Sequence, residues 1–180
     1  LYLAEADLLR EAGVIQRAIT LLDAVLEEMP DQTDLLYTHG MLSAEIGDVD
    51  ALEAKMRRVL AINPDHAEAL NALGYTLADE TSRYAEALEL ISKALELMPD
   101  SAAILDSMGW VLYKLGRYEE SLVYLTKAAK KEDDGEIVAH LGEVLWAAGK
   151  HRQALDVWES GLRREPENAH IVEAMQRLNP

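Results

Sequence analysis

The 180-residue chain is strongly acidic, because 33 Asp and Glu oppose 17 Lys and Arg and give a formal net charge of −16. A field of this sign repels nucleic acid, and the sequence has no basic patch interleaved with aromatic residues that would offset it. Cysteine is absent, which excludes disulfides, thiol catalysis and cysteine-ligated zinc.

No apolar run approaches the roughly 18 residues that a membrane span needs, which predicts no membrane contact by this segment. The sequence begins at Leu1, without an initiator methionine and already within a helical pattern. We therefore expect a fragment of a longer protein.

A glycine in similar surroundings returns along the chain, with spacings of 34, 35 and 33 residues, at Gly40, Gly74, Gly109 and Gly142. Prolines keep step with it at Pro30, Pro64, Pro99 and Pro166. Apolar residues between them follow the 3.6-residue period of helices, and the alternation typical of strands is absent. Each proline is expected to end a helix, because proline donates no backbone hydrogen bond. The period predicts an array of stacked helix pairs.

Taken in chain order, the pattern predicts one array over residues 1–180. Its helix pairs cover about 1–30, 32–64, 66–99, 101–133 and 135–166, and a capping helix covers 168–178. Turns inside the pairs carry residues suited to a left-handed helix C-terminus, namely Gly13, Gly47, Gly116 and Gly149. The third pair has one extra residue near Thr81, which we expect to lengthen its internal turn. The fourth pair ends in Lys130–Gly135 instead of a proline, and we interpret that run as a solvated turn.

Small residues predict close packing within each pair. The recurring glycines let the first helix approach the second, which presents small residues at Ala18, Ala87 and Ala154. A large residue at such a place costs about 1–3 kcal/mol through overpacking. Leu52 and Ser121 occupy two of these second-helix positions, and we expect a looser fit there.

The segment Leu105–Tyr113, followed by Leu115–Tyr118, resembles the tetratricopeptide repeat (TPR) family, whose unit is a helix-turn-helix of 34 residues. Small residues stand at the eighth and twentieth positions of that unit, as they do here. The likeness covers nearly the whole chain. It implies an all-α, right-handed superhelical solenoid that serves as a protein-interaction scaffold.

A narrower likeness involves Leu70–Asp79, Leu105–Tyr113 and His140–Trp146, which look like the C-terminal part of proteobacterial TPR lipoproteins. One such lipoprotein, in pseudomonads, is an adaptor of a periplasmic carboxyl-terminal processing protease. This resemblance implies a place at the periplasmic face of the outer membrane. It also implies that the protease and its substrates are partners.

In the TPR family, the second, fifth, ninth and twelfth positions of each repeat line the concave surface. Carried over to this chain, they give the partner-binding residues Tyr37, Met41, Asn71, Tyr75, Asp106, Trp110, Tyr113, Glu143 and Trp146. Exposed aromatic residues edged by carboxylates are typical of a protein-binding surface. The alternative is that some rings, including Trp110 and Tyr113, pack between helices as ordinary core. Trp158 lies on the buried stripe of its helix and is expected in the core.

One TPR subtype clamps a C-terminal carboxylate with Lys and Asn at the fifth and ninth positions. This chain has Tyr37 and Met41 at those positions in the second pair, and the third and fourth pairs lack the clamp as well. A co-chaperone role is therefore not expected. An apolar or basic peptide segment fits the predicted groove better.

Motifs for catalysis are absent from the sequence, which has no phosphate loop, dinucleotide glycine pattern or serine-nucleophile motif. His140 and Glu143 have a spacing found in some metal sites, but no other histidine stands at a helical spacing that would complete the set. We expect no enzyme activity, cofactor or metal. The first hypothesis is a protein-binding scaffold or adaptor, and the alternative is a structural or self-association segment of a larger TPR array.

Overall fold

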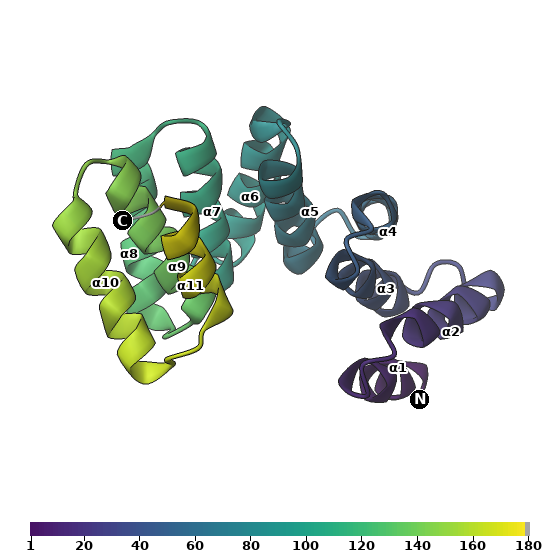
Figure 1. Ribbon diagram of the computed structural model, residues 1–180. Coiled ribbons are helices and arrows are strands. Elements are labelled where there is room, and N and C mark those ends of the chain that lie inside the picture. Colours follow the sequence, from purple (N-terminus) through teal and green to yellow (C-terminus); the bar gives the residue numbers. More distant parts are fainter. Residues whose placement is uncertain (179–180) are drawn as a thin grey trace.

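Eleven α-helices follow one another through residues 1–178, the part of the chain that the computed structural model describes (Figure 1). They are α1 (Tyr2–Glu11), α2 (Ile15–Glu28), α3 (Thr33–Glu45), α4 (Val49–Ile62), α5 (Ala67–Glu80), α6 (Tyr84–Leu97), α7 (Ala102–Lys114), α8 (Tyr118–Lys131), α9 (Gly135–Ala147), α10 (His151–Arg164) and α11 (Ala169–Leu178). No strand occurs within these residues, which confirms the predicted all-α class. None of the described helices combines the length and apolar character needed to cross a membrane.

The helices stack as consecutive pairs, from α1 with α2 to α9 with α10, and each pair packs on the next (Figure 1). α11 follows the last pair and packs mainly against α9. This superhelical arrangement of helix pairs is the predicted solenoid.

The turns inside four pairs place glycine in the left-handed region that its missing Cβ makes accessible, with φ between +73° and +78° at Gly13, Gly47, Gly116 and Gly149. The third pair differs, and the prediction of a longer turn there is wrong. Three residues separate α5 from α6, as in the other pairs, and α5 itself is one residue longer than α3 or α7. The Thr81 hydroxyl donates to the Leu77 carbonyl at 2.5 Å, so it closes the last turn of the longer helix.

The recurring glycines lie where two helices meet most closely. A Cβ built on Gly74 would stand 2.6 Å from Cγ1 of Ile91, so only glycine permits the observed approach of α5 to α6. The looser fit expected at Ser121 is not found, because that residue is fully buried and its hydroxyl donates to the Gly109 carbonyl at 2.6 Å. Serine therefore joins α8 to α7 by a hydrogen bond.

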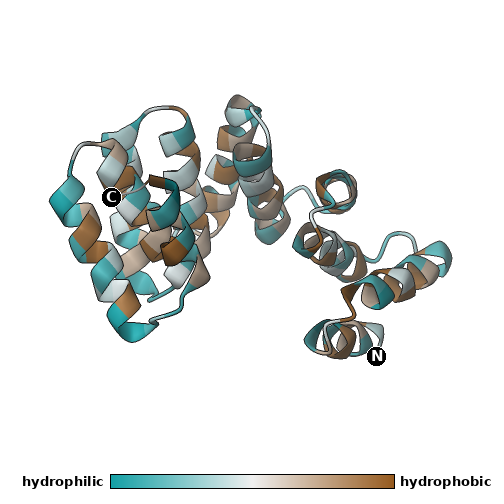
Figure 2. Ribbon diagram, viewed as in Figure 1, coloured by the Kyte–Doolittle hydropathy of each residue, from teal (hydrophilic) through white to brown (hydrophobic). Residues whose placement is uncertain are grey.

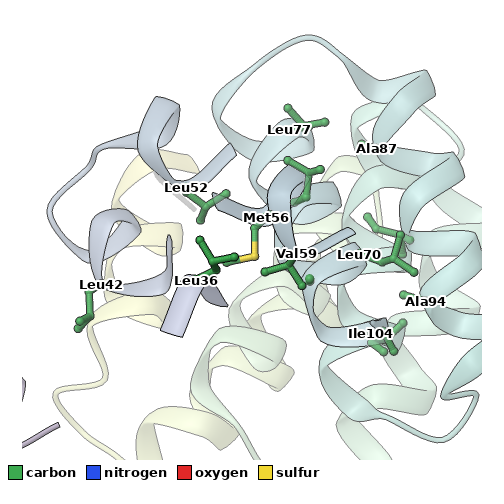
Figure 3. Packing of buried hydrophobic residues seen from close by; sticks show 14 of the residues in the cluster. Leu36, Leu42, Leu52, Met56, Val59, Leu70, Leu77, Ala87, Ala94 and Ile104 are labelled. Atoms are coloured by element: carbon green, nitrogen blue, oxygen red, sulfur yellow. The ribbon is translucent and has the colours of Figure 1, made fainter. Parts of the chain in front are cut away.

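Most helices carry both apolar and polar residues (Figure 2), and the buried residues of the helices are mostly apolar. A continuous core runs through the first three pairs and α7, and Figure 3 shows Met56 and Val59 of α4 between Leu36 of α3 and Leu70 of α5. A second cluster in the last pairs surrounds Trp158, which is fully buried as predicted.

Ion pairs tie the connections between helix pairs to the following outer helix. An aspartate in each of four connections pairs with a basic residue 27 to 31 positions later: Asp31 with Arg58, Asp65 with Lys93, Asp100 with Lys131, and Asp133 with Arg164. Exposed pairs of this kind contribute at most about 1 kcal/mol each.

The run Lys130–Gly135 contains a helix cap that replaces the missing proline. The Asp134 carboxylate accepts the amide protons of Glu136 and Ile137, at 2.8 and 3.2 Å, and so satisfies two free donors at the start of α9. We expect Asp134→Ala to lower the free energy of unfolding by about 1 kcal/mol. Urea unfolding followed by circular dichroism measures this change, and Asp134→Asn, which keeps an acceptor, is expected to lose much less.

Candidate protein-binding groove

Odd-numbered helices line the inner face of the stack. α1 contacts α3, α5 contacts α7, α7 contacts α9 and α9 contacts α11, whereas the even-numbered helices pack mainly on odd-numbered ones. Helices that meet across repeats lie on the shorter, inner side of a curved array. We call α1, α3, α5, α7, α9 and α11 the inner helices and the others the outer helices.

A pocket of about 420 Å³ opens on the inner face between α3, α5, α7 and α9. Five predicted residues line it: Tyr37, Met41, Asn71, Tyr75 and Asp106. Its lining also contains the carboxylates Glu68, Glu132, Asp134 and Glu136, and none of the described residues that line it is Lys or Arg. We call it the acidic pocket.

A second, smaller hollow of about 250 Å³ lies between α5, α7, α9 and α11. Two further predicted residues, Trp110 and Glu143, line it, and Tyr75 and Glu136 line both hollows. The Tyr75 hydroxyl donates to a Glu136 carboxylate oxygen at 2.7 Å and so joins α5 to α9 across α7. Burial, and then the Glu136 charge, raise the pKa of the Tyr75 hydroxyl, so it remains a donor at neutral pH.

Tyr113 and Trp146 are not among the residues that line either hollow. The Tyr113 hydroxyl donates to Glu143 at 3.4 Å, and burial followed by the Glu143 charge raises its pKa to about 12. The Trp146 ring stacks on His151 at a centroid distance of 4.2 Å and also meets Trp158. Both rings therefore pack mainly within the protein.

The expectation that Trp110 is an exposed anchor is wrong, because only 4% of the residue is accessible. Its ring stacks on His140 at 3.9 Å between centroids, and Lys114 Nζ lies 4.8 Å from the ring centroid. The indole N–H donates to Asp79 at 3.0 Å. The alternative of core packing holds for this residue, and a bulky histidine on the next inner helix is the physical reason.

Asp106 and Glu143, predicted as polar groove residues, are also buried. Both Asp106 carboxylate oxygens lie within 3.1 Å of His140 Nδ1, in a contact between α7 and α9. Burial opposes the imidazolium charge, but the Asp106 carboxylate outweighs it and raises the pKa of His140. Glu143 pairs with Arg177 of α11.

Sequence reasoning did not connect these partners, although one signal was available. Asp106 and His140 are 34 residues apart, as are Glu143 and Arg177, so each pair joins similar positions on successive inner helices. No group of three or more potential metal-ligating side chains lies together within residues 1–178.

Stacked helix pairs with a groove along their inner face define a helical-repeat protein of the solenoid class. A family model described as "Tetratricopeptide repeat" matches residues 65–130. A TPR repeat-containing protein of Pseudomonas aeruginosa is 47% identical over 143 residues, which is 79% of this chain and 24% of that protein. Human anaphase-promoting complex subunit 7 is 23% identical over 173 residues, 94% of this chain and 30% of that protein.

Solved structures share the fold at lower sequence identity. A thermophilic TPR protein of Thermus thermophilus superimposes with a TM-score of 0.83 at 22% identity, over 99% of this chain and 98% of that chain. MamA of Desulfovibrio magneticus gives a TM-score of 0.74 at 19% identity, over 93% and 95%. At these identities the likeness concerns the fold alone.

The family match, the relatives and the fold all make the chain similar to proteins of the tetratricopeptide repeat family. Proteins of this family generally mediate protein–protein interaction and are generally not catalysts. The chain spans less than a third of the length of either relative named above, at 24% and 30%.

Proposed function

We propose that the chain is a scaffold that holds a protein or peptide partner along its inner face. The acidic pocket carries this proposal, because residues from α3, α5 and α7 converge on a single hollow. Its volume of about 420 Å³ falls in the range of ligand-binding clefts. Met41 and Met98, at its edge, are more than a third exposed, and such flexible side chains adapt to an incoming chain.

A narrower proposal is that the chain is an adaptor that brings substrates to a carboxyl-terminal processing protease at the periplasmic face of the outer membrane. It rests on the likeness of Leu70–Asp79, Leu105–Tyr113 and His140–Trp146 to the lipoprotein adaptors. The acidic inner face would present partners to the protease while the chain stays non-catalytic.

Site-specific photo-crosslinking tests both proposals. The photoreactive residue p-benzoylphenylalanine replaces Met41, which is 37% exposed in the acidic pocket, or Val123, which is 53% exposed on the outer helix α8. In cells that express the chain, we expect a defined adduct from position 41 and none of the same mass from position 123. An adduct with the purified processing protease or one of its substrates would support the adaptor role.

Three results would count against the scaffold proposal: equal adducts from both positions, adducts from position 123 alone, or no adduct from either. An adduct between two copies of the chain would favour the alternative, a self-association segment.

A further inference from the structure

The chemistry of the acidic pocket indicates what it holds. We propose that it takes an arginine side chain from an extended segment of the partner. This inference rests on the proposed function and names the partner's anchoring group.

Several carboxylates elsewhere on the protein have basic partners of their own, but in the described part of the chain the pocket carboxylates Glu68, Glu132, Asp134 and Glu136 form no ion pair with Lys or Arg. On the outer helices, for example, Glu53 and Glu86 share the guanidinium groups of Arg57 and Arg83. Within residues 1–178, no Lys or Arg forms an ion pair with Glu68 or Glu136. A cation from another molecule that enters this part of the groove would therefore meet carboxylates that no Lys or Arg of residues 1–178 already pairs.

The residues around Glu68 and Glu136 leave both carboxylates able to accept further hydrogen bonds. His66 Nδ1 lies 3.3 Å from Glu68, but it accepts the Ala69 amide proton and so donates nothing to that carboxylate. Glu136 receives one hydrogen bond, from the Tyr75 hydroxyl. A carboxylate has about four lone-pair sites, so both can accept further donors.

A separate observation, an unpaired oxygen in the pocket lining, also favours a ligand that donates hydrogen bonds. The side-chain oxygen of Asn71 is shielded from solvent and has no hydrogen-bond partner among residues 1–178. Asn71 lines the acidic pocket, three residues after Glu68 on the same face of α5. A buried acceptor without a partner costs free energy, and a donor from another molecule would recover it once the partly buried Asn71 side chain turns its oxygen toward the pocket.

Arginine satisfies these demands together. Its guanidinium presents five N–H donors in a planar fork, which can serve a carboxylate and an amide oxygen at once. The rings of Tyr37 and Tyr75 line the same pocket and provide faces on which a guanidinium stacks. Met41 and Met98 offer apolar surface to its aliphatic stem.

A pair of synthetic peptides tests the inference directly. The probe is a fluorescein-labelled nonapeptide, Gly-Ser-Gly-Leu-Arg-Leu-Gly-Ser-Gly, and its match carries citrulline, the neutral analogue of arginine, at the central position. We expect the arginine peptide to bind saturably in fluorescence anisotropy and the citrulline peptide to bind about tenfold more weakly or worse. Raising the salt concentration should weaken the binding of the arginine peptide and leave the binding of the citrulline peptide unchanged.

Matched variants locate the binding. We expect the affinity for the arginine peptide to fall by about threefold to tenfold in each of three variants, Glu68→Gln, Glu136→Gln and Asn71→Leu. Glu96→Gln removes the same charge from an exposed position on the outer helix α6 and is expected to leave binding unchanged. Circular dichroism melts confirm that each variant is folded before it is compared.

The inference is overturned if the two peptides bind equally, if the arginine peptide fails to saturate below about 1 mM, or if Glu96→Gln weakens binding as much as Glu136→Gln. Failure here is separable from failure of the proposed function. Adducts from position 41 together with equal affinity for the two peptides would retain the scaffold and remove the arginine anchor.

Discussion

Replacing Gly142 with alanine is expected to lower the free energy of unfolding by about 1–3 kcal/mol, although alanine is the better helix former. A Cβ built at this position would lie 2.1 Å from Nε1 of Trp158. That ring is fully buried, and its N–H donates to the Ala139 carbonyl at 3.2 Å, so it has little room to retreat. The overpacking cost therefore outweighs the gain in helix propensity.

Urea unfolding followed by circular dichroism shows whether Gly142→Ala lowers or raises the free energy of unfolding. Helix propensity alone would raise the stability of Gly142→Ala by about 0.5–1 kcal/mol, so an upward shift of the unfolding midpoint would show that the contact with Trp158 is not restrictive. The control is a double-mutant cycle with Trp158→Phe, which removes the indole nitrogen nearest to the built Cβ. In that background the Gly142→Ala penalty is expected to shrink.

The fold could be predicted because its determinants are local and repeated. Glycine at Gly40, Gly74, Gly109 and Gly142, together with the helical period of the apolar residues, is enough to indicate stacked helix pairs. The two local features that were predicted wrongly, the turn after α5 and the fit at Ser121, each depend on a single hydrogen bond. The Thr81 hydroxyl extends α5 and the Ser121 hydroxyl binds α7, and neither effect shows in an apolar pattern.

The inner face was predicted less well because burial there depends on the next repeat. The positional rule places Tyr37, Met41 and Asn71 on the concave face, and in the structure these three residues line the acidic pocket. The same rule treats Trp110 as exposed, but the ring is covered by His140, a residue one repeat later. A rule that considers one repeat at a time cannot detect such a partner.

The buried pair of Asp106 and His140 is expected to make the protein less stable as the pH rises above neutrality. The pKa of folded His140 is raised above its ordinary value of 6.5: burial opposes the charge, but the Asp106 carboxylate, with help from Glu136 and Glu143, outweighs it. Below pH 6.5 the imidazole is protonated in both the folded and unfolded states, so the pair contributes fully to stability until the pH falls to the pKa of Asp106, which burial raises above its ordinary value. Its contribution falls as the pH rises from 6.5 and is lost once the pH passes the raised pKa.

Removing the carboxylate should lower stability and flatten this dependence. We expect Asp106→Asn to lower the free energy of unfolding by about 3 kcal/mol at pH 6, because a buried imidazolium is left without its counter-charge. At pH 9 we expect a smaller decrease. Chemical denaturation between about pH 6 and 9 measures the slope, and NMR titration of the His140 ring measures its pKa. Asp34→Asn removes an equal charge from an exposed position on α3 and serves as the control.

The two measurements separate an electrostatic role from simple packing. If Asp106 acts through its charge, the pKa of His140 falls in Asp106→Asn while Asp34→Asn leaves it unchanged. If the pair matters only as packed volume, the isosteric asparagine preserves both the stability and the slope. A wild-type His140 that titrates at or below 6.5 would contradict the ion pair itself, since the buried imidazole would then be held neutral between α7 and α9.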